Sequence, residues 1–218
     1  MSCCCPHAVS AGRFFSRFAR RYRRRFEKKG FEPCQRQLLA GLEQAGFQGA
    51  QILEIGSGVG HLHQTLLERG AASAVGVELA PKMIEEARQW AEKRGLGERV
   101  TYREGDFMLL AEELPVADVT VLDKVVCCYP DAEGLVKTSL AKTRSVYALT
   151  IPRQRFFVMA AVAMVAFVLR RLGSDFRPYV HEPAAIDGWI RQAGFVSVSR
   201  DRTVIWESWV YRKSPSEG

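Results

Sequence analysis

The chain has 218 residues, 47% of them hydrophobic, which favours one globular domain with added segments. Its six cysteines follow no regular spacing, and its polar, basic N-terminal segment does not resemble a secretory signal peptide. Both observations argue against a secreted disulfide framework and for a reducing, cytoplasmic compartment. The net charge of +7 is concentrated in residues 1–30, which carry nine Lys or Arg and one Glu, so the remainder is close to neutral.

The basic segment predicts an amphipathic helix whose aromatic side chains recur every four residues: Phe14, Phe18, Tyr22 and Phe26. Arginines fill its other side, and Gly30 is a suitable end. A second helix is predicted from Pro33 to about Gln44, with leucines facing inward. We therefore expect residues 1–48 to form an N-terminal region: a cysteine tail, the basic aromatic helix and a lid helix.

Residues 49–218 form the main predicted domain. Strands are expected at 51–55, 73–78, 99–104, 118–126 and 145–151, and helices at 61–70, 81–95, 108–113 and 131–142. This alternation argues for a parallel sheet covered by helices on both faces. Residues 195–201 and 202–212 alternate with period two and are almost contiguous, which predicts an antiparallel pair closing the sheet.

An apolar run, residues 156–169, interrupts the polar and charged sequence before that pair. Fourteen residues are too few to span a bilayer, so the run predicts a core or interfacial helix. Pairs of arginines bracket it on both sides. We place it in a helical insertion covering about residues 153–180.

Three glycines follow the first predicted strand in the stretch ILEIGSGVG. A nicotinamide-type fingerprint, G-x-G-x-x-G, would need a glycine where the chain has His61. The spacing is instead E-x-G-x-G-x-G, from Glu54 through Gly56, Gly58 and Gly60. No lysine follows, as a nucleoside triphosphate loop would require. Such glycines can also serve only as tight-turn residues.

This turn, with Glu78 after the second strand and Asp106 after the third, resembles the class I S-adenosylmethionine-dependent methyltransferases over about residues 50–211. The resemblance implies a Rossmann-like α/β fold with a seven-stranded, mostly parallel sheet whose last strand is antiparallel, and S-adenosylmethionine as cofactor. In the family, the acid at the Glu78 position accepts hydrogen bonds from the ribose hydroxyls, and the one at Asp106 faces the adenine amino group. Asp106 can also be interpreted as a helix cap. The cofactor-binding set implied comprises Glu54, Gly56, Ser57, Gly58, Gly60, Glu78, Leu79, Asp106, Phe107 and Asp123.

The segments CCYPD and RPYVHEP are similar to the magnesium-protoporphyrin methyltransferase branch, which methylates a carboxylate. That branch carries His before its Tyr-Pro, where this chain has Cys128. The expected catalytic residues are His181, at a strand end as a base, together with Cys128 and Tyr129, and the expected acceptor residues are Tyr22 and Arg153. His61 and His63 are expected at the surface or the start of a helix. No metal site is assigned.

The predicted reaction is methyl transfer to a small, hydrophobic or carboxylate-bearing molecule. Two alternatives stay open. One is metalloid or thiol methylation using Cys127 and Cys128, with the N-terminal CCC as a further thiol source. The other is a non-catalytic membrane- or nucleic-acid-binding protein on this scaffold. Residues 10–29 and 156–169 offer a peripheral membrane contact, and nucleic acid is the less favoured partner.

Overall fold

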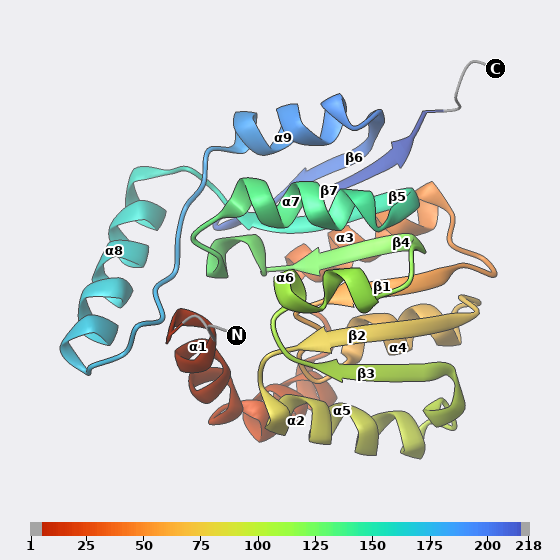
Figure 1. Cartoon of the computed structure of the whole chain (residues 1–218), viewed down its shortest axis with the longest axis horizontal. Helices are drawn as coiled ribbons and strands as arrows, with labels where there is room; N and C mark the ends of the chain where they lie inside the picture. Colours follow the sequence, from red (N-terminus) through yellow and green to blue (C-terminus); the bar gives the residue numbers. More distant parts are fainter. Residues whose placement is uncertain (1–5, 215–218) are drawn as a thin grey trace.

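The computed structural model describes residues 6–214, so the predictions made for the N-terminal cysteines lie outside the described residues. A single sheet has the strand order β3-β2-β1-β4-β5-β7-β6 (Figure 1). Strands β1 to β5 are parallel, and β7 is antiparallel to both of its neighbours. The predicted seven-stranded, mostly parallel sheet is thereby confirmed. The strands are β1 Gln51–Ile55, β2 Ser73–Glu78, β3 Val100–Glu104, β4 Ala117–Asp123, β5 Thr143–Pro152, β6 Phe195–Arg202 and β7 Trp206–Lys213.

Helices cover both faces of the sheet, and an apolar cluster lies beneath each layer. Leucines of α3 (Pro33–Ala45) and α4 (His61–Glu68) pack on one face, with Ala91 of α5 (Pro81–Lys93) at its margin. Side chains of α6 (Phe107–Leu110), α7 (Ala132–Ala141) and α9 (Pro183–Gln192) pack on the other. The strand order reverses direction between β1 and β4, and ligands of such sheets bind beyond the strand ends at that point.

The basic N-terminal segment forms two helices, α1 (Pro6–Ser16) and α2 (Ala19–Lys29), instead of the one predicted. At the break, the N–H groups of Arg17 and Phe18 bond to carbonyls three residues back, at 3.3 and 2.9 Å. Both helices contact α5: Phe15 of α1 packs in a cluster with Met83, and Arg23 of α2 pairs with Glu86 at 2.8 Å. Helix α1 also packs against Phe176 through Phe15. The break divides the predicted aromatic stripe between the two helices.

Strand β4 ends at Asp123, three residues earlier than predicted. Lys124 has φ +60°, in the left-handed region that a side chain with a Cβ rarely adopts. The chain then enters a 3-10 turn, η3 (Val126–Cys128), in which both cysteines lie. The turn moves them out of the sheet and under the strand ends.

Helix α8 (Phe156–Arg171) is the predicted apolar insertion, and Figure 1 shows it standing beside α1, outside the helix layers. Only Val158 and Leu169 of its residues are buried. Among residues 6–214, no helix is both long and apolar enough to cross a bilayer.

Helix α3 packs closely over the antiparallel end of the sheet, and Gly41 permits the contact. A Cβ on Gly41 would lie 2.7 Å from Cγ2 of Val210 and would also overlap the Ser199 hydroxyl. By contrast, nothing lies within 4 Å of a Cβ built on Gly188 in α9.

We therefore expect Gly41→Ala to destabilise the protein by about 1–3 kcal/mol through overpacking, although alanine is the better helix former. Gly188→Ala is the matched control and should stabilise the protein by up to about 1 kcal/mol. Urea unfolding monitored by circular dichroism measures both. Equal effects of the two substitutions would contradict this account of α3 packing.

Candidate functional site

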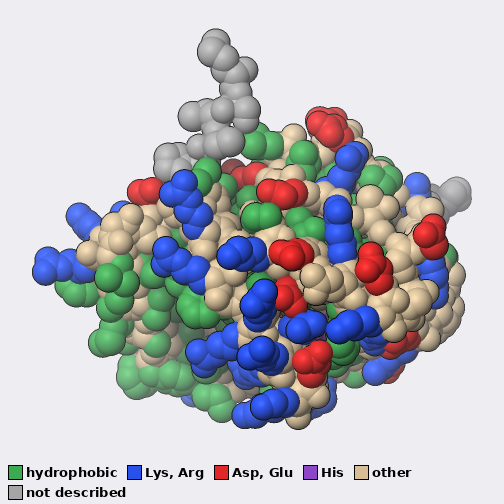
Figure 2. All heavy atoms as spheres, turned by 90° about the horizontal axis from the view of Figure 1, so that it is seen from below, with side chains coloured by type: hydrophobic (Ala, Val, Ile, Leu, Met, Phe, Trp, Pro, Cys, Tyr) green, Lys and Arg blue, Asp and Glu red, His purple; other side chains and the backbone are tan. Residues whose placement is uncertain are grey.

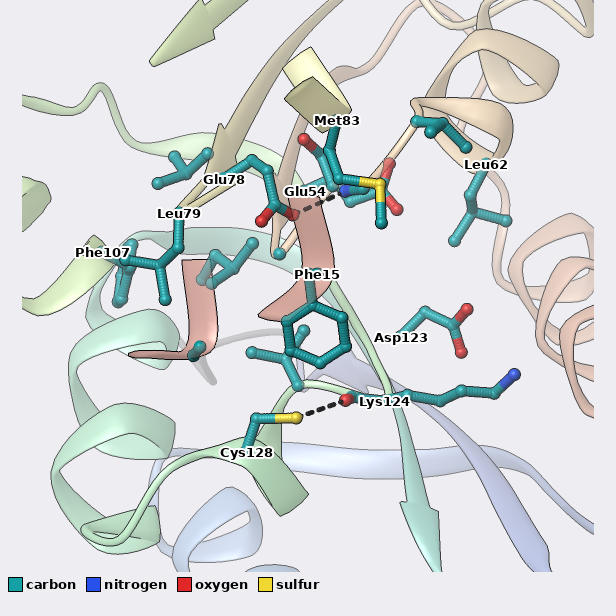
Figure 3. A pocket seen from close by; sticks show the side chains of 18 of the residues that line it. Phe15, Glu54, Leu62, Glu78, Leu79, Met83, Phe107, Asp123, Lys124 and Cys128 are labelled. Carbon is teal, nitrogen blue, oxygen red and sulfur yellow. Dashed lines mark hydrogen bonds between the residues drawn. The ribbon is translucent and has the colours of Figure 1, made fainter. Parts of the chain in front are cut away.

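A cavity of about 450 Å³ lies beyond the carboxyl ends of β1, β2 and β4 (Figure 3). The glycine turn, the ends of β2 and β4, and the η3 turn form its floor, and α1, α2 and the start of α3 close it from above. Most of the residues predicted for the cofactor reach it: Glu54, Gly56, Ser57, Gly58, Glu78, Leu79, Asp106, Phe107 and Asp123. Gly60 is the exception, because it is the N-cap of α4 and faces His63 and Gln64.

The glycine turn requires left-handed backbone. Gly56 has φ +65°, and a Cβ there would lie 2.5 Å from Cγ2 of Val125. Gly58 has φ +53°, and its N–H points to the second strand. Only glycine allows this path at low cost, so the main chain itself forms the cavity wall.

Glu78 is a carboxylate that two backbone N–H groups hold on the cavity wall. The N–H groups of Gly58 and Ala80 donate to its two oxygens, at 2.8 and 2.9 Å. Burial raises the pKa of Glu78 above its ordinary value, and these backbone donors oppose the rise. Each carboxylate oxygen can accept a second bond, so Glu78 presents two fixed acceptors to the cavity.

Glu54 is held from below by a buried network. Its Oε2 accepts from His63 Nδ1 at 2.6 Å and from the His63 backbone N–H at 3.1 Å. The His63 Nε2 lies 3.0 Å from the Tyr102 hydroxyl, to which Gln64 donates at 2.9 Å. His63 lies in the first turn of α4, one of the two positions predicted for it, but its side chain is fully buried and pairs with Glu54, so a surface position is excluded. Burial raises the pKa of Glu54, and His63 opposes the rise.

His61 lines the cavity beside α2. Its ring stacks on Phe26, with centroids 3.8 Å apart and planes 15° apart, and meets Trp90 edge-on. Burial, reinforced by Arg94 and other nearby cationic groups, lowers the pKa of His61 to about 3. His61 begins α4, as predicted, but it is enclosed by aromatic rings.

Asp106 has two partners in the structure. It caps α6 by accepting from the Met108 N–H at 3.0 Å, as the alternative interpretation predicted. The same oxygen accepts from the Tyr129 hydroxyl, so both residues lie at one end of the cavity. Burial raises the pKa of Asp106.

At the other end, α3 supplies polar contacts to the end of β4. The Gln35 amide donates to Asp123 Oδ2 at 2.6 Å, and the Lys124 ammonium donates to Glu32 Oε2 at 2.6 Å. Burial would lower the pKa of Lys124, but the carboxylates of Asp123 and Glu32 outweigh it and raise the pKa. Lys124 therefore stays charged at neutral pH.

The two cysteines of η3 lie together, with sulfurs 3.9 Å apart. Cys128 lines the cavity. Its hydrogen bond with Cys127, with burial, raises the pKa of the Cys128 thiol well above the ordinary value, so it is protonated at neutral pH. Over the described part of the chain, no three His, Cys, Asp or Glu side chains gather as a metal site would require.

His181 and Arg153 do not line the cavity, contrary to prediction. His181 lies in a loop rather than at a strand end, and its Nε2 donates to the Tyr129 carbonyl at 2.9 Å. Arg153 lies against the β6–β7 turn, where its guanidinium donates to the Thr203 carbonyl at 2.9 Å. Tyr22, the other predicted acceptor residue, does line the cavity and is 47% exposed.

Several lining residues were not predicted. Phe15 of α1 projects between Glu78 and Cys128 in Figure 3, and Glu32, Gln35 and Lys124 form the polar end. The sequence signal for Glu32 and Gln35 was available as a capping box, Glu-x-x-Gln, at the start of α3. Phe15 lies outside the predicted aromatic stripe of Phe14, Phe18, Tyr22 and Phe26, so the four-residue spacing did not indicate it.

The cavity fits a polar adenosyl ligand. Three polar atoms of lining residues, Ser57 Oγ, His61 Nε2 and Asp123 Oδ1, are buried with no hydrogen-bond partner among the described residues. Buried polar atoms are normally paired, so these three atoms indicate a ligand that supplies the missing partners.

Comparisons with known proteins agree with this geometry. Residues 52–146 match the family model described as a methyltransferase domain. The ubiquinone biosynthesis O-methyltransferase of Pseudomonas aeruginosa (strain LESB58) is 28% identical over 159 residues, covering 70% of this chain and 67% of that protein. The chain is a class I S-adenosylmethionine-dependent methyltransferase.

Other relatives of the methyltransferase extend the comparison. The ubiquinone biosynthesis O-methyltransferase of Xylella fastidiosa (strain 9a5c) is 30% identical over 152 residues, covering 67% of this chain and 61% of that protein. In fold, the methyltransferase resembles magnesium protoporphyrin IX methyltransferase from Synechocystis PCC 6803 with bound S-adenosylmethionine. The TM-score is 0.68 at 18% identity, covering 98% of this chain and all of the other.

We expect the stability of the methyltransferase to fall as pH decreases below about 6.5, partly because of His61. The pKa of His61 is about 3 in the folded protein, so below about pH 6.5 its imidazole stays neutral in the folded chain but binds a proton in the unfolded chain. His61→Phe keeps the stack on Phe26 and removes this titration. Its free energy of unfolding should therefore depend less on pH, by up to about 1.4 kcal/mol per pH unit. Parallel slopes for the two proteins in urea titrations between pH 7 and pH 5 would contradict the assignment.

Proposed function

We propose that this methyltransferase transfers the methyl group of S-adenosylmethionine to an oxygen of a small, largely apolar acceptor that carries a hydroxyl or carboxyl group. The observation that carries the proposal is Glu78, a buried carboxylate fixed by two backbone donors on the wall of the cavity. A fixed pair of acceptors suits the vicinal diol of a ribose.

In this proposal the cofactor lies along the cavity, with its adenine at one end and its amino-acid part at the other. Glu78 would accept from the ribose hydroxyls, with Leu79 and Phe107 against the adenine. Asp106 would face the adenine amino group, and Tyr129 would share or yield its bond to that carboxylate. The glycine turn, with Ser57, would face the sugar and sulfur, and Glu54 and Asp123 lie where the amino-acid end would reach.

When bound, S-adenosylmethionine supplies an electrophilic methyl group on a sulfonium with a good leaving group. The protein then needs mainly to align an acceptor oxygen with that methyl group and exclude water. Helices α1 and α2 do both, since they close the cavity over the strand ends. Phe15 and Ala11 would hold an apolar acceptor against Cys128.

The polar end of the cavity supports an acidic group on the acceptor. Lys124 stays cationic and therefore favours an ionised oxygen over a neutral one. A carboxylate is already ionised at neutral pH and needs no base, and a nearby ammonium lowers the pKa of a phenol. The similarity to O-methyltransferases of ubiquinone biosynthesis also favours oxygen as the acceptor atom.

Metalloid or thiol methylation through the cysteine pair has less support. Both sulfurs lie near the Lys124 carbonyl, at 3.3 and 3.5 Å, and the raised pKa of Cys128 keeps it neutral. A protonated thiol is a poor ligand and a poor nucleophile. In this proposal Cys128 is an apolar wall of the acceptor site.

Replacing Glu78 by alanine should weaken binding of S-adenosylhomocysteine by about 100-fold or more, because two hydrogen bonds to a charged group are lost. Isothermal titration calorimetry measures this directly. Glu104→Ala is the matched control: it pairs with Glu78 in the sheet register, is exposed and lies outside the cavity. Affinity that is unchanged in folded Glu78→Ala protein would refute the cofactor assignment.

Variants of His181 distinguish a positioning role from a role as the general base. We infer that it positions the η3 segment through the Tyr129 carbonyl and takes no proton from the acceptor. His181→Ala should lower kcat by about tenfold and leave cofactor affinity unchanged. His181→Gln keeps an N–H donor and should recover much of the rate. If His181 is instead the base, glutamine will be as inactive as alanine, and the rate of the wild type will follow a histidine titration.

A further inference from the structure

We propose that α8 together with the basic surface of α1 and α2 is a docking surface for an anionic lipid bilayer. The contact is peripheral, with α8 lying in the interface beside the cavity. This inference goes beyond the proposed reaction and does not depend on which acceptor is methylated.

The apolar part of the surface is unusual for a protein in water. Helix α8 exposes large side chains over most of its length: Phe156 (85%), Met159 (46%), Met164 (68%), Val165 (48%), Phe167 (63%) and Val168 (47%), with Leu172 (76%) just after it. An exposed apolar patch of this kind marks a protein or membrane contact. The exposed residues occupy several sides of the helix, whereas a partner helix would need one narrow stripe. Fluid hydrocarbon accepts such a surface.

The charged part lies beside it. Figure 2 shows a hydrophobic area at the lower left next to a dense group of Lys and Arg side chains. Leu169 of α8 and Ala11 of α1 lie in one buried apolar cluster with Phe176, so the basic residues of α1 and α2 lie beside the apolar helix. The exposed cations that form no ion pair with any described residue include Arg13, Arg17, Arg21, Arg24, Lys28, Lys29, Arg155, Arg170 and Arg171.

Charge decides between a bilayer and a second copy of the chain. In a dimer built on α8, two cationic surfaces would face each other and repel. An anionic bilayer neutralises them, and each Lys or Arg near such a surface adds to the attraction. Apolar residues with flanking arginines are also the pattern of helices that lie in the headgroup region. Nucleic acid would use the cations but leave the exposed phenylalanines and methionines in water.

The surface also lies beside the cavity. The cavity is lined by residues of both basic helices: Ala8, Ala11 and Phe15 of α1, and Tyr22 and Arg25 of α2. The helices that close the cavity therefore also carry the basic surface. A bilayer against α8 and α1 would therefore meet the cover of the site. A lipophilic acceptor would then pass from the bilayer to the cavity along an apolar path.

Vesicle flotation of the full chain tests the proposal, with phosphatidylcholine alone or phosphatidylcholine mixed with phosphatidylglycerol. We expect binding to the anionic vesicles, weakened by salt, and little binding to the neutral ones. Met164→Glu with Phe167→Glu should reduce binding by about tenfold or more, as should Arg170→Glu with Arg171→Glu. Val196→Glu is the matched control, because Val196 is an exposed apolar residue (49%) on the edge strand β6.

Affinity for S-adenosylhomocysteine, measured on every variant, should be unchanged, since none of these residues lines the cavity. This readout separates a failure of docking from a failure of the cofactor assignment. Absence of binding to anionic vesicles overturns the proposal. So does equal binding by the wild type and the α8 variants. A wild-type dimer in size-exclusion chromatography that the α8 variants convert to monomer, without a change in vesicle binding, assigns α8 to a second copy instead.

Discussion

The hydrogen bond from the Gly58 N–H to the Glu78 carboxylate organises the site. It joins the turn after β1 to the end of β2, and it forms only because the glycine backbone turns left-handed and approaches Val125 closely at Gly56. The ends of β2, β1 and β4 are neighbours in the sheet, and the bond ties the first two of them together in the cavity wall. The bond also prevents Glu78 from turning out to water, which leaves its remaining acceptor capacity directed at the cavity.

The other half of the site belongs to segments that precede the sheet in the chain. The capping box of α3 has a second use: Gln35 bonds to Asp123, and Glu32 bonds to Lys124. A helix start is thereby coupled to the strand end where the backbone is strained. Because α1 and α2 lie over the same cavity, and α1 shares a buried apolar cluster with α8, the cover of the site and the proposed membrane surface form one continuous region.

Much of the site could be predicted from short-range sequence. Glycines and acids directly after strands are placed by the strand itself, so Glu54, Gly58 and Glu78 lie in the cavity as expected. Two residues whose positions depend on contacts distant in the sequence, His181 and Arg153, were wrongly predicted to lie in the site. His181 follows a loop that bonds beneath η3, and Arg153 is drawn away by the β6–β7 turn. No periodic pattern encodes either contact.

The sequence by itself determined the alternation of strands and helices, the glycine turn and the order of its acids, because hydrophobic period and glycine conformation are local properties. Tertiary structure alone decided the insertion of β7 between β5 and β6, the break between α1 and α2, and the burial of His63 against Glu54. Tertiary structure also left α8 outside the core. An apolar run fits a buried or an exposed helix equally well, and only the packing of the remaining chain determines whether any surface is left to cover it.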